Sequence, residues 1–342
     1  MKRKPSQRPD PLRIVAIGGG TGLSTLLSGL KAHGDAVDIT AIVTVTDDGG
    51  SSGRLRREFD ILPPGDIRNC MVALSEDEAL LSKLFQHRFA AGRGLKGHSF
   101  GNLFLAALTH LTGDFAQAVK VSSEVLAIAG RIFPSTSSNV TIEADLADGT
   151  AVAGETKISR ARTPIDRIRL NPAAAKPLPE ALEAIAQADL ITFGPGSLFT
   201  SVIPNLLVDG IPRAIRRSRA RTAYFVNLMW QPWETMHFSA ADHILALERH
   251  AGPRLLDWVI VNTHPISGAR RRRYAAEQVF PVDNDLLLLG RRSFRVLGRN
   301  LLAKSEKVRH DPTLIAAVAM ELAAQSREER LQRKARSRTM NG

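Results

Sequence analysis

The chain has 342 residues, of which 44% are hydrophobic and 23% charged, a composition that excludes a mostly disordered protein. Its single cysteine, Cys70, excludes an intrachain disulfide and a cysteine-rich zinc site. The apolar runs are too short to span a bilayer, and the basic N-terminus lacks the apolar core of a secretory signal. We therefore expect a cytoplasmic protein without a transmembrane segment.

Two thirds of the formal net charge of +12 lies in residues 1–13 and 326–342, which carry +4 each. We interpret residues 1–11 as a flexible basic leader and residues 326–342 as a charged C-terminal tail, with a single domain over residues 12–325 between them. A basic charge on a folded face would indicate a nucleic-acid site. Charged tails favour solubility and weak association instead, so we expect no specific nucleic acid.

The hydrophobic pattern begins with an apolar run over residues 12–17, helical spacing over 21–32 and a β-branched run over 39–45. This order predicts a βαβ unit with a right-handed crossover. Further helices are expected at 80–89, 103–111, 119–129, 181–188, 240–250 and 313–325. Further strands are expected at 140–146, 151–153, 165–170, 190–193, 223–226 and 258–261. The alternation predicts an α/β fold with a mostly parallel sheet, which binds ligands at the carboxyl ends of its strands.

A glycine-rich turn, Gly-Gly-Gly-Thr-Gly over residues 18–22, follows the first strand and opens the first helix. Such a turn either connects the two elements tightly or holds phosphate on the free N–H groups of the helix start. It lacks the third glycine of the dinucleotide fingerprint and the lysine of a Walker A loop. We predict a phosphate site of neither class, formed by Gly19, Gly20, Thr21 and Gly22.

A second turn of this kind, Gly-Pro-Gly-Ser-Leu-Phe-Thr-Ser, covers residues 194–201. Its hydroxyl groups can donate to phosphate or cap the next helix. Two such turns on one sheet suggest a cleft for a diphosphate or a sugar phosphate, and there is no Gly-x-Ser-x-Gly elbow to indicate a serine hydrolase. The predicted ligand-binding residues of this turn are Gly194, Gly196, Ser197, Thr200 and Ser201.

Polar residues in three other loops are further candidates for ligand binding. Asp47 and Asp48 follow the second strand and can bind ribose or a magnesium ion, although an Asp-Gly turn is the simpler interpretation. Arg68 and Asn69 can approach an anionic ligand, or the segment can cap a helix and leave the arginine in solvent. Asn102 precedes an apolar helix. The nine histidines show no metal-protease spacing.

Taken together, these segments resemble the YvcK branch of the CofD-like family from about residue 12 to residue 325. The matching segments, in order, are 17–23 (IGGGTGL), 43–55 (VTVTDDGGSSGRL), 62–69 (LPPGDIRN), 97–102 (GHSFGN), 194–201 (GPGSLFTS), 227–229 (NLM) and 309–311 (RHD). The family pattern continues after NLM as TQPGETDG, whereas this chain has WQPWETMH over residues 230–237. The two tryptophans can narrow the cleft, supply a stacking surface or remove a partner contact.

The resemblance implies a Rossmann-like CofD fold with helical insertions and adds Asn227 and Arg309 to the ligand-binding residues. It also implies a UDP-N-acetylglucosamine-binding regulator that links carbon metabolism to cell-wall precursor supply and cell shape. Such a regulator needs no cofactor; we expect it to contact a protein of cell-wall precursor synthesis and to form a homo-oligomer. The alternative is a CofD-like transferase of a phosphorylated group, with magnesium at Asp47 and Asp48. A third possibility is an RNA- or membrane-associated protein that uses its basic tails.

Overall fold

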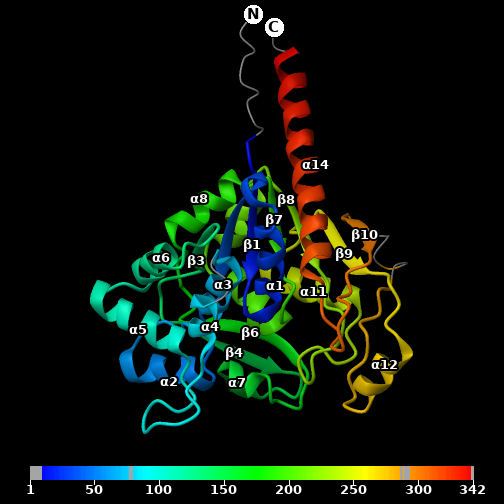
Figure 1. Cartoon of the computed structure of the whole chain (residues 1–342). Helices are drawn as coiled ribbons and strands as arrows, with labels where there is room; N and C mark the ends of the chain where they lie inside the picture. The colour runs from blue at the N-terminus through cyan, green and yellow to red at the C-terminus, as the bar shows by residue number, and fades with distance from the viewer. Residues whose placement is uncertain (1–9, 77–79, 286–287, 289–292, 340–342) are drawn as a thin grey trace, which may run out of the picture.

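A computed structural model describes residues 10–76, 80–285, 288 and 293–339 of the chain (Figure 1). The predicted leader, residues 1–11, therefore lies outside the described residues except for Asp10 and Pro11. Within the described residues, every helix is either too short or too polar to reach across a bilayer.

The centre of the fold is a seven-stranded parallel sheet with the strand order β10-β9-β8-β7-β1-β2-β3. The expected βαβ unit is present, and β1 pairs with β2 along its whole length, from Leu12 opposite Val37 to Gly18 opposite Val43. Both strands are almost entirely buried, which explains their continuous apolar sequences. The strands are β1 (Leu12–Gly18), β2 (Val37–Val43), β3 (Arg131–Pro134), β7 (Leu190–Phe193), β8 (Arg221–Phe225), β9 (Trp258–Asn262) and β10 (Arg295–Arg299).

Helices cover both faces of this sheet, as right-handed crossovers in opposite directions from β1 require. The group on one face comprises α1 (Gly20–Lys31), α3 (Gly65–Leu74) and α14 (Pro312–Thr339). The other group comprises α8 (Pro179–Gln187), α9 (Ile203–Leu206), α10 (Ile211–Arg217) and α11 (Ala240–Ala251). The predicted α/β class with a mostly parallel sheet is confirmed.

The helical insertions lie between β2 and β3 and after β9. They comprise α2 (Gly50–Phe59), α4 (Leu81–Gln86), α5 (Phe100–Thr112), α6 (Phe115–Val125) and α12 (Gly268–Ala275). A small antiparallel sheet, β5-β4-β6, is built from β4 (Thr141–Leu146), β5 (Ala151–Ala153) and β6 (Ile165–Asn171). With the short helix α7 (Glu155–Ile158), this sheet lies below the carboxyl ends of the central strands in Figure 1.

The last helix differs from the expected tail. Helix α14 continues without a break from Pro312 to Thr339, and its upper half projects beyond the amino ends of the strands (Figure 1). Ser326 is only 3% exposed, and Arg327 and Arg330 both pair with the carboxylate of Asp189. Asp189 is buried directly before β7, so it needs cationic partners, and a helix presents residues three apart on one face. Residue 325 therefore does not mark the end of the folded structure.

Candidate functional site

The carboxyl ends of β1 and β7 lie side by side near the centre of the sheet, where the strand order changes direction. A glycine-containing turn follows each strand, and a pocket of about 450 Å³ opens between the two turns. Open α/β sheets bind ligands at this position because the loops leaving the two strands diverge. Of the predicted ligand-binding residues, the pocket brings together Gly19, Gly20, Thr21, Gly22, Gly196, Ser197, Thr200, Ser201, Asn227 and Arg309.

The first turn presents the amino end of α1 to the pocket. Gly20 has a φ of +60°, which favours glycine, and lets the chain turn directly from the strand into the helix. A Cβ atom on Gly22 would lie 2.3 Å from the carbonyl oxygen of Pro195, so the two turns pack backbone against backbone. The first N–H groups of α1 have no intrahelical acceptor, and they carry the positive end of the helix dipole. This end of the pocket is therefore suited to an anion.

The second turn holds a carboxylate in place. Ser197 Oγ donates to Oε2 of Glu234 at 2.5 Å and accepts from the backbone N–H of Thr200 at 3.2 Å. Ser159 Oγ donates to the other oxygen of Glu234 at 3.0 Å. The hydroxyl proton of Ser197 is thus engaged with Glu234, and its oxygen caps the following helix, which is the second of the two roles expected from the sequence.

Three carboxyl groups around the pocket are held toward their neutral forms. Burial, with the nearby charges of Asp47 and Asp66, raises the pKa of Glu155 to about 9. Burial and Asp47 raise the pKa of Asp66 to about 7, although its hydrogen bond with the backbone of Gly20 acts in the opposite direction. Burial also raises the pKa of Glu234 against its bonds from Ser197 and Ser159. A neutral Glu155 can donate a hydrogen bond to a sugar hydroxyl or to a carbonyl group.

Sequence reasoning missed these acids as site residues. Asp66 lies inside a segment that carries the family resemblance. Glu234 agrees with the family pattern inside segment 230–237, which otherwise departs from it, so these positions were the available signal. Glu155 follows a short strand of the small sheet, and nothing in its local sequence distinguishes it. Its role depends on contacts between distant segments, such as those of Thr156 with Asp48 and of Ser159 with Glu234, which a local pattern does not reveal.

The third wall of the pocket follows β8 and carries the two amides Asn227 and Gln231 beside Trp230. Asn227 Nδ2 donates to Oε1 of Gln231 at 3.4 Å. The indole of Trp230 donates to the carbonyl of Phe238 at 3.1 Å, and its ring packs edge-on against His237 and Phe280. Trp230 is therefore a fixed aromatic surface at the pocket.

A loop before α14 closes the pocket on the opposite side. The exposed side chain of Arg309 lies at the rim, and His310 lies next to it. Burial lowers the pKa of His310 to about 4, so its ring is neutral at physiological pH. Its Nε2 atom is buried and has no hydrogen-bond partner in the described part of the chain. The rim thus offers one permanent cation and one neutral polar ring.

The other predicted residues, Asp47, Asp48, Arg68, Asn69, Asn102 and Gly194, do not line this pocket. Asp48 accepts from both the backbone N–H (2.8 Å) and the hydroxyl (2.6 Å) of Thr156, which anchors α7. Asp47 accepts from the backbone N–H of Gly49 at 2.8 Å, as in the alternative Asp-Gly turn. Gly194 has a φ of +67° and shapes the turn after β7.

Arg68 and Asn102 belong to a neighbouring polar cluster. Arg68 donates to Ser99 Oγ and to Asn69 Oδ1, both at 2.6 Å. Asn102 donates to Ser51 Oγ at 3.1 Å, and its own carbonyl oxygen is buried without a partner among the described residues. These contacts join α2, α3 and α5, which explains why these side chains do not reach the pocket.

A magnesium ion was the cofactor expected for the transferase alternative. In the described part of the chain, no three His, Cys, Asp or Glu side chains are grouped so as to hold a metal ion. Asp47 and Asp48 already accept hydrogen bonds from Gly49 and Thr156. A magnesium site at this pair would therefore need most of its ligands from water and from a bound phosphate.

The chain is similar to known proteins over nearly its whole length. Residues 14–303 match the family described as 2-phospho-L-lactate transferase CofD. The gluconeogenesis factor of Bacillus subtilis is 47% identical over 311 residues, which cover 91% of this chain and 98% of that protein. The gluconeogenesis factor of Halalkalibacterium halodurans is 47% identical over 314 residues, covering 90% and 95% respectively. A crystal structure of a UPF0052-family protein from Bacillus halodurans has a TM-score of 0.88 and 46% identity, covering 91% of this chain and 100% of that one.

Proposed function

Because this chain belongs to the CofD-like family and to its gluconeogenesis-factor branch, we propose that it is a regulator that binds UDP-N-acetylglucosamine between the turns after β1 and β7. The observation that carries this proposal is the direct packing of the two glycine turns at the switch point of the sheet. Gly22 lies against Pro195 so closely that no side chain fits between them, and the amino end of α1 faces the pocket. A diphosphate fits this arrangement because backbone N–H groups and a helix dipole complement its charge.

The remaining walls offer complementary groups to the two ends of a UDP-sugar. Asn227 and Gln231 can pair with the imide and carbonyl groups of uracil, since amides both donate and accept. Trp230 offers a surface on which a ring can stack. On the other side, neutral Glu155 and the fixed Glu234 can bind sugar hydroxyls. Arg309 supplies the charge at the rim that a diphosphate requires.

In this proposal the occupied pocket is a signal to a protein partner in cell-wall precursor synthesis, and binding requires no cofactor. The names of the relatives place them in gluconeogenesis, which supports the carbon-metabolism part of this proposal. We expect the regulator to act as a homo-oligomer. The alternative activity, transfer of a phosphorylated group with magnesium, predicts consumption of the bound nucleotide. Binding without consumption separates the two.

Calorimetry against a panel of ligands tests the proposal. We expect UDP-N-acetylglucosamine to bind more tightly than UDP, UMP, NAD and ADP-ribose. Arg309→Ala should weaken binding by about 10- to 100-fold, since a charge-assisted hydrogen bond contributes roughly 1.5–3 kcal/mol. Arg57→Ala, an exposed arginine on α2, is the matched control and should not change the affinity.

Phosphorus NMR of the same mixture with magnesium added should show intact UDP-N-acetylglucosamine after hours. Preferential binding of NAD, or an unchanged affinity in Arg309→Ala, contradicts the site assignment. Steady conversion of the nucleotide favours the transferase over the regulator.

A further inference from the structure

A basic groove lies at the opposite end of the sheet from the pocket, at the amino ends of the strands. Two recesses of about 740 Å³ and 1020 Å³ meet there and share Ser218, Arg219, Arg330 and Lys334. The continuous recess, which we call the amino-end groove, runs between α14 on one side and the segments around α8 and α10 on the other. Helix α14 forms its projecting wall (Figure 1).

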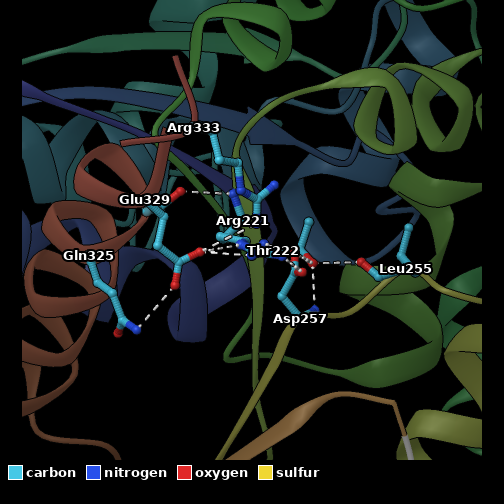
Figure 2. Close-up of polar contacts among 8 residues, drawn as sticks. Arg221, Thr222, Leu255, Asp257, Gln325, Glu329 and Arg333 are labelled. Carbon is cyan, nitrogen blue, oxygen red and sulfur yellow. Dashed lines mark hydrogen bonds and ion pairs between the residues drawn. The ribbon is translucent and has the colours of Figure 1, made fainter. Parts of the chain in front are cut away.

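The carboxylates near the middle of the amino-end groove are already neutralised by ion pairs. Arg221 pairs with Asp257 at 2.6 Å and with Glu329 of α14 at 2.7 Å (Figure 2). Buried Asp189 is paired with Arg327 and with Arg330. Among the described lining residues, this leaves the exposed Asp209 as the one acid outside such a pair.

Many of the basic side chains of the groove have no such partner. In the described part of the chain, no ion pair joins a carboxylate to Arg13, Lys176, Arg213, Arg217, Arg219 or Arg254, all of which are exposed. Arg333 lies 3.9 Å from Glu329, a long distance for an ion pair, and its side chain is 72% exposed. Unpaired guanidinium groups at a concave surface favour an anionic ligand, and their planar fork matches a phosphate group.

We propose that the amino-end groove binds the phosphodiester backbone of a single-stranded nucleic acid, without sequence preference. The basic side chains extend along two joined recesses instead of surrounding one point. A chain of phosphates therefore fits this groove better than a single anion does. No aromatic side chain lines either recess among the described residues, so binding would depend on contacts between the basic side chains and phosphate instead of on stacking of the nucleobases. Contacts to phosphate alone position a strand without reading its sequence.

An acidic protein fits this groove less well. Protein interfaces place apolar or aromatic side chains at their centre and charges at their rim. Here the four residues shared by the two recesses are Ser218, Arg219, Arg330 and Lys334, so the centre is polar and basic. An anionic membrane surface is also disfavoured, because the exposed half of α14 presents Leu331 as its single large apolar side chain among the described residues.

This groove changes the interpretation of the net charge. Half of the charge assigned to tails comes from residues 326–342, and the structure places the first part of that segment in a helix that lines a folded surface. The basic side chains of this helix lie beside arginines from α10 and from the loop before β9. The condition under which a basic protein indicates nucleic acid, charge on a folded face, is therefore met.

Fluorescence anisotropy with a labelled 20-nucleotide oligouridine tests the proposal on the full chain. We expect a Kd of roughly 1–100 μM near 100 mM salt, as for sequence-independent binding, and a steep loss of affinity with added salt. The double variant Arg217→Glu/Arg219→Glu should weaken binding about tenfold or more and reduce the slope of log K against log salt by about 1.4. Both side chains are exposed, so the fold should be retained.

The matched control is Arg57→Glu/Arg93→Glu, which changes the net charge equally at exposed positions outside the groove. This control variant should retain the affinity for oligouridine within about twofold. A single-stranded DNA of equal length tests whether the sugar contributes to binding. Equal losses in both double variants would show that net charge alone attracts the strand and would overturn the site. So would absence of binding at 100 μM protein, or tighter binding of polyglutamate or phosphatidylglycerol vesicles than of oligouridine.

Discussion

Arg327, in the middle of α14, donates through its guanidinium to the carboxylate of Asp189, the residue that directly precedes β7. The carboxylate is only 1% exposed, and Arg330, one turn further along the helix, donates to its other oxygen at 2.5 Å. The same Arg327 also donates to the carbonyl groups of Asp10 and Pro11. One side chain thus joins the C-terminal helix, the start of the chain and the central sheet.

This arrangement predicts that Arg327→Ala/Arg330→Ala destabilises the protein. The substitution leaves a buried carboxylate whose one remaining donor among the described residues is the backbone N–H of Arg13. Removing the partners of a buried charge costs about 3–5 kcal/mol. Urea unfolding followed by circular dichroism measures the loss, and the exposed Arg336→Ala serves as the control that should change the unfolding free energy by less than about 0.5 kcal/mol. A double variant as stable as the parent contradicts this account.

The ion pairs of Asp189 with Arg327 and Arg330 also predict the pH range in which the protein loses stability in acid. Burial alone would raise the pKa of Asp189, but the bonds from Arg327 and from the backbone N–H of Arg13, with the charges of Arg327 and Arg330, lower it. A carboxyl whose pKa is lower in the folded state stabilises the fold above its unfolded pKa of about 3.9. That contribution disappears as the pH falls through the folded pKa. Urea unfolding from pH 6 to pH 2 should therefore show a decline below about pH 4 that is smaller in Asp189→Asn.

Asp66, which lies against Gly19 beside the pocket, predicts a second pH dependence. Its pKa in the folded state is about 7, above the unfolded value, so the folded chain binds more protons between about pH 4 and pH 7. Stability should therefore decrease between about pH 4 and pH 7. Affinity for a diphosphate should decrease as the pH rises through 7, because the ionised carboxylate faces the glycine turn. Calorimetry at pH 6, 7 and 8 measures the trend. Asp66→Asn, which keeps an acceptor for the N–H of Gly20, should remove most of it, and an undiminished trend in this variant contradicts the assignment.

The sequence alone predicts the elements whose signal is local. The βαβ unit, the strand at 190–193 and both glycine turns follow from runs of apolar residues and from glycine at strand ends. It does not predict contacts between distant segments. Asp48 looked like a ligand for ribose or magnesium because its partner, Thr156, lies 108 positions away. In the same way, the charged segment after residue 325 looked like a tail because nothing near it indicates the buried Asp189.

The contact between the two turns predicts that Gly22→Ala impairs binding. The added Cβ would lie 2.3 Å from the carbonyl oxygen of Pro195 and 2.8 Å from Cα of Gly196, so one turn must move. We expect at least a tenfold loss of affinity for UDP-N-acetylglucosamine, because the amino end of α1 then shifts relative to the second turn. Gly34→Ala is the control: it meets no atom within 4 Å, and its φ of +51° costs stability of about 1 kcal/mol without affecting the pocket. Equal affinities in the parent and in Gly22→Ala would show that the ligand binds elsewhere.

Replacing either of the two tryptophans that depart from the family pattern should have a different effect on ligand binding. Trp230 lines the pocket and is held by Phe238, His237 and Phe280, whereas Trp233 is exposed, has a φ of +67° and lies outside it. Trp230→Thr should therefore weaken binding of UDP-N-acetylglucosamine by roughly 5- to 100-fold, the loss of one stacked ring at about 1–3 kcal/mol.

Trp233→Gly should leave the affinity unchanged. It should also raise the unfolding temperature, because glycine accepts a positive φ without strain and the exposed contact with Arg162 contributes little. Calorimetry and thermal unfolding of the two variants side by side measure both effects. Tighter binding in Trp230→Thr would show that the indole narrows the pocket instead of supporting the ligand. A lower affinity in Trp233→Gly would mean that the exposed ring folds over the bound nucleotide.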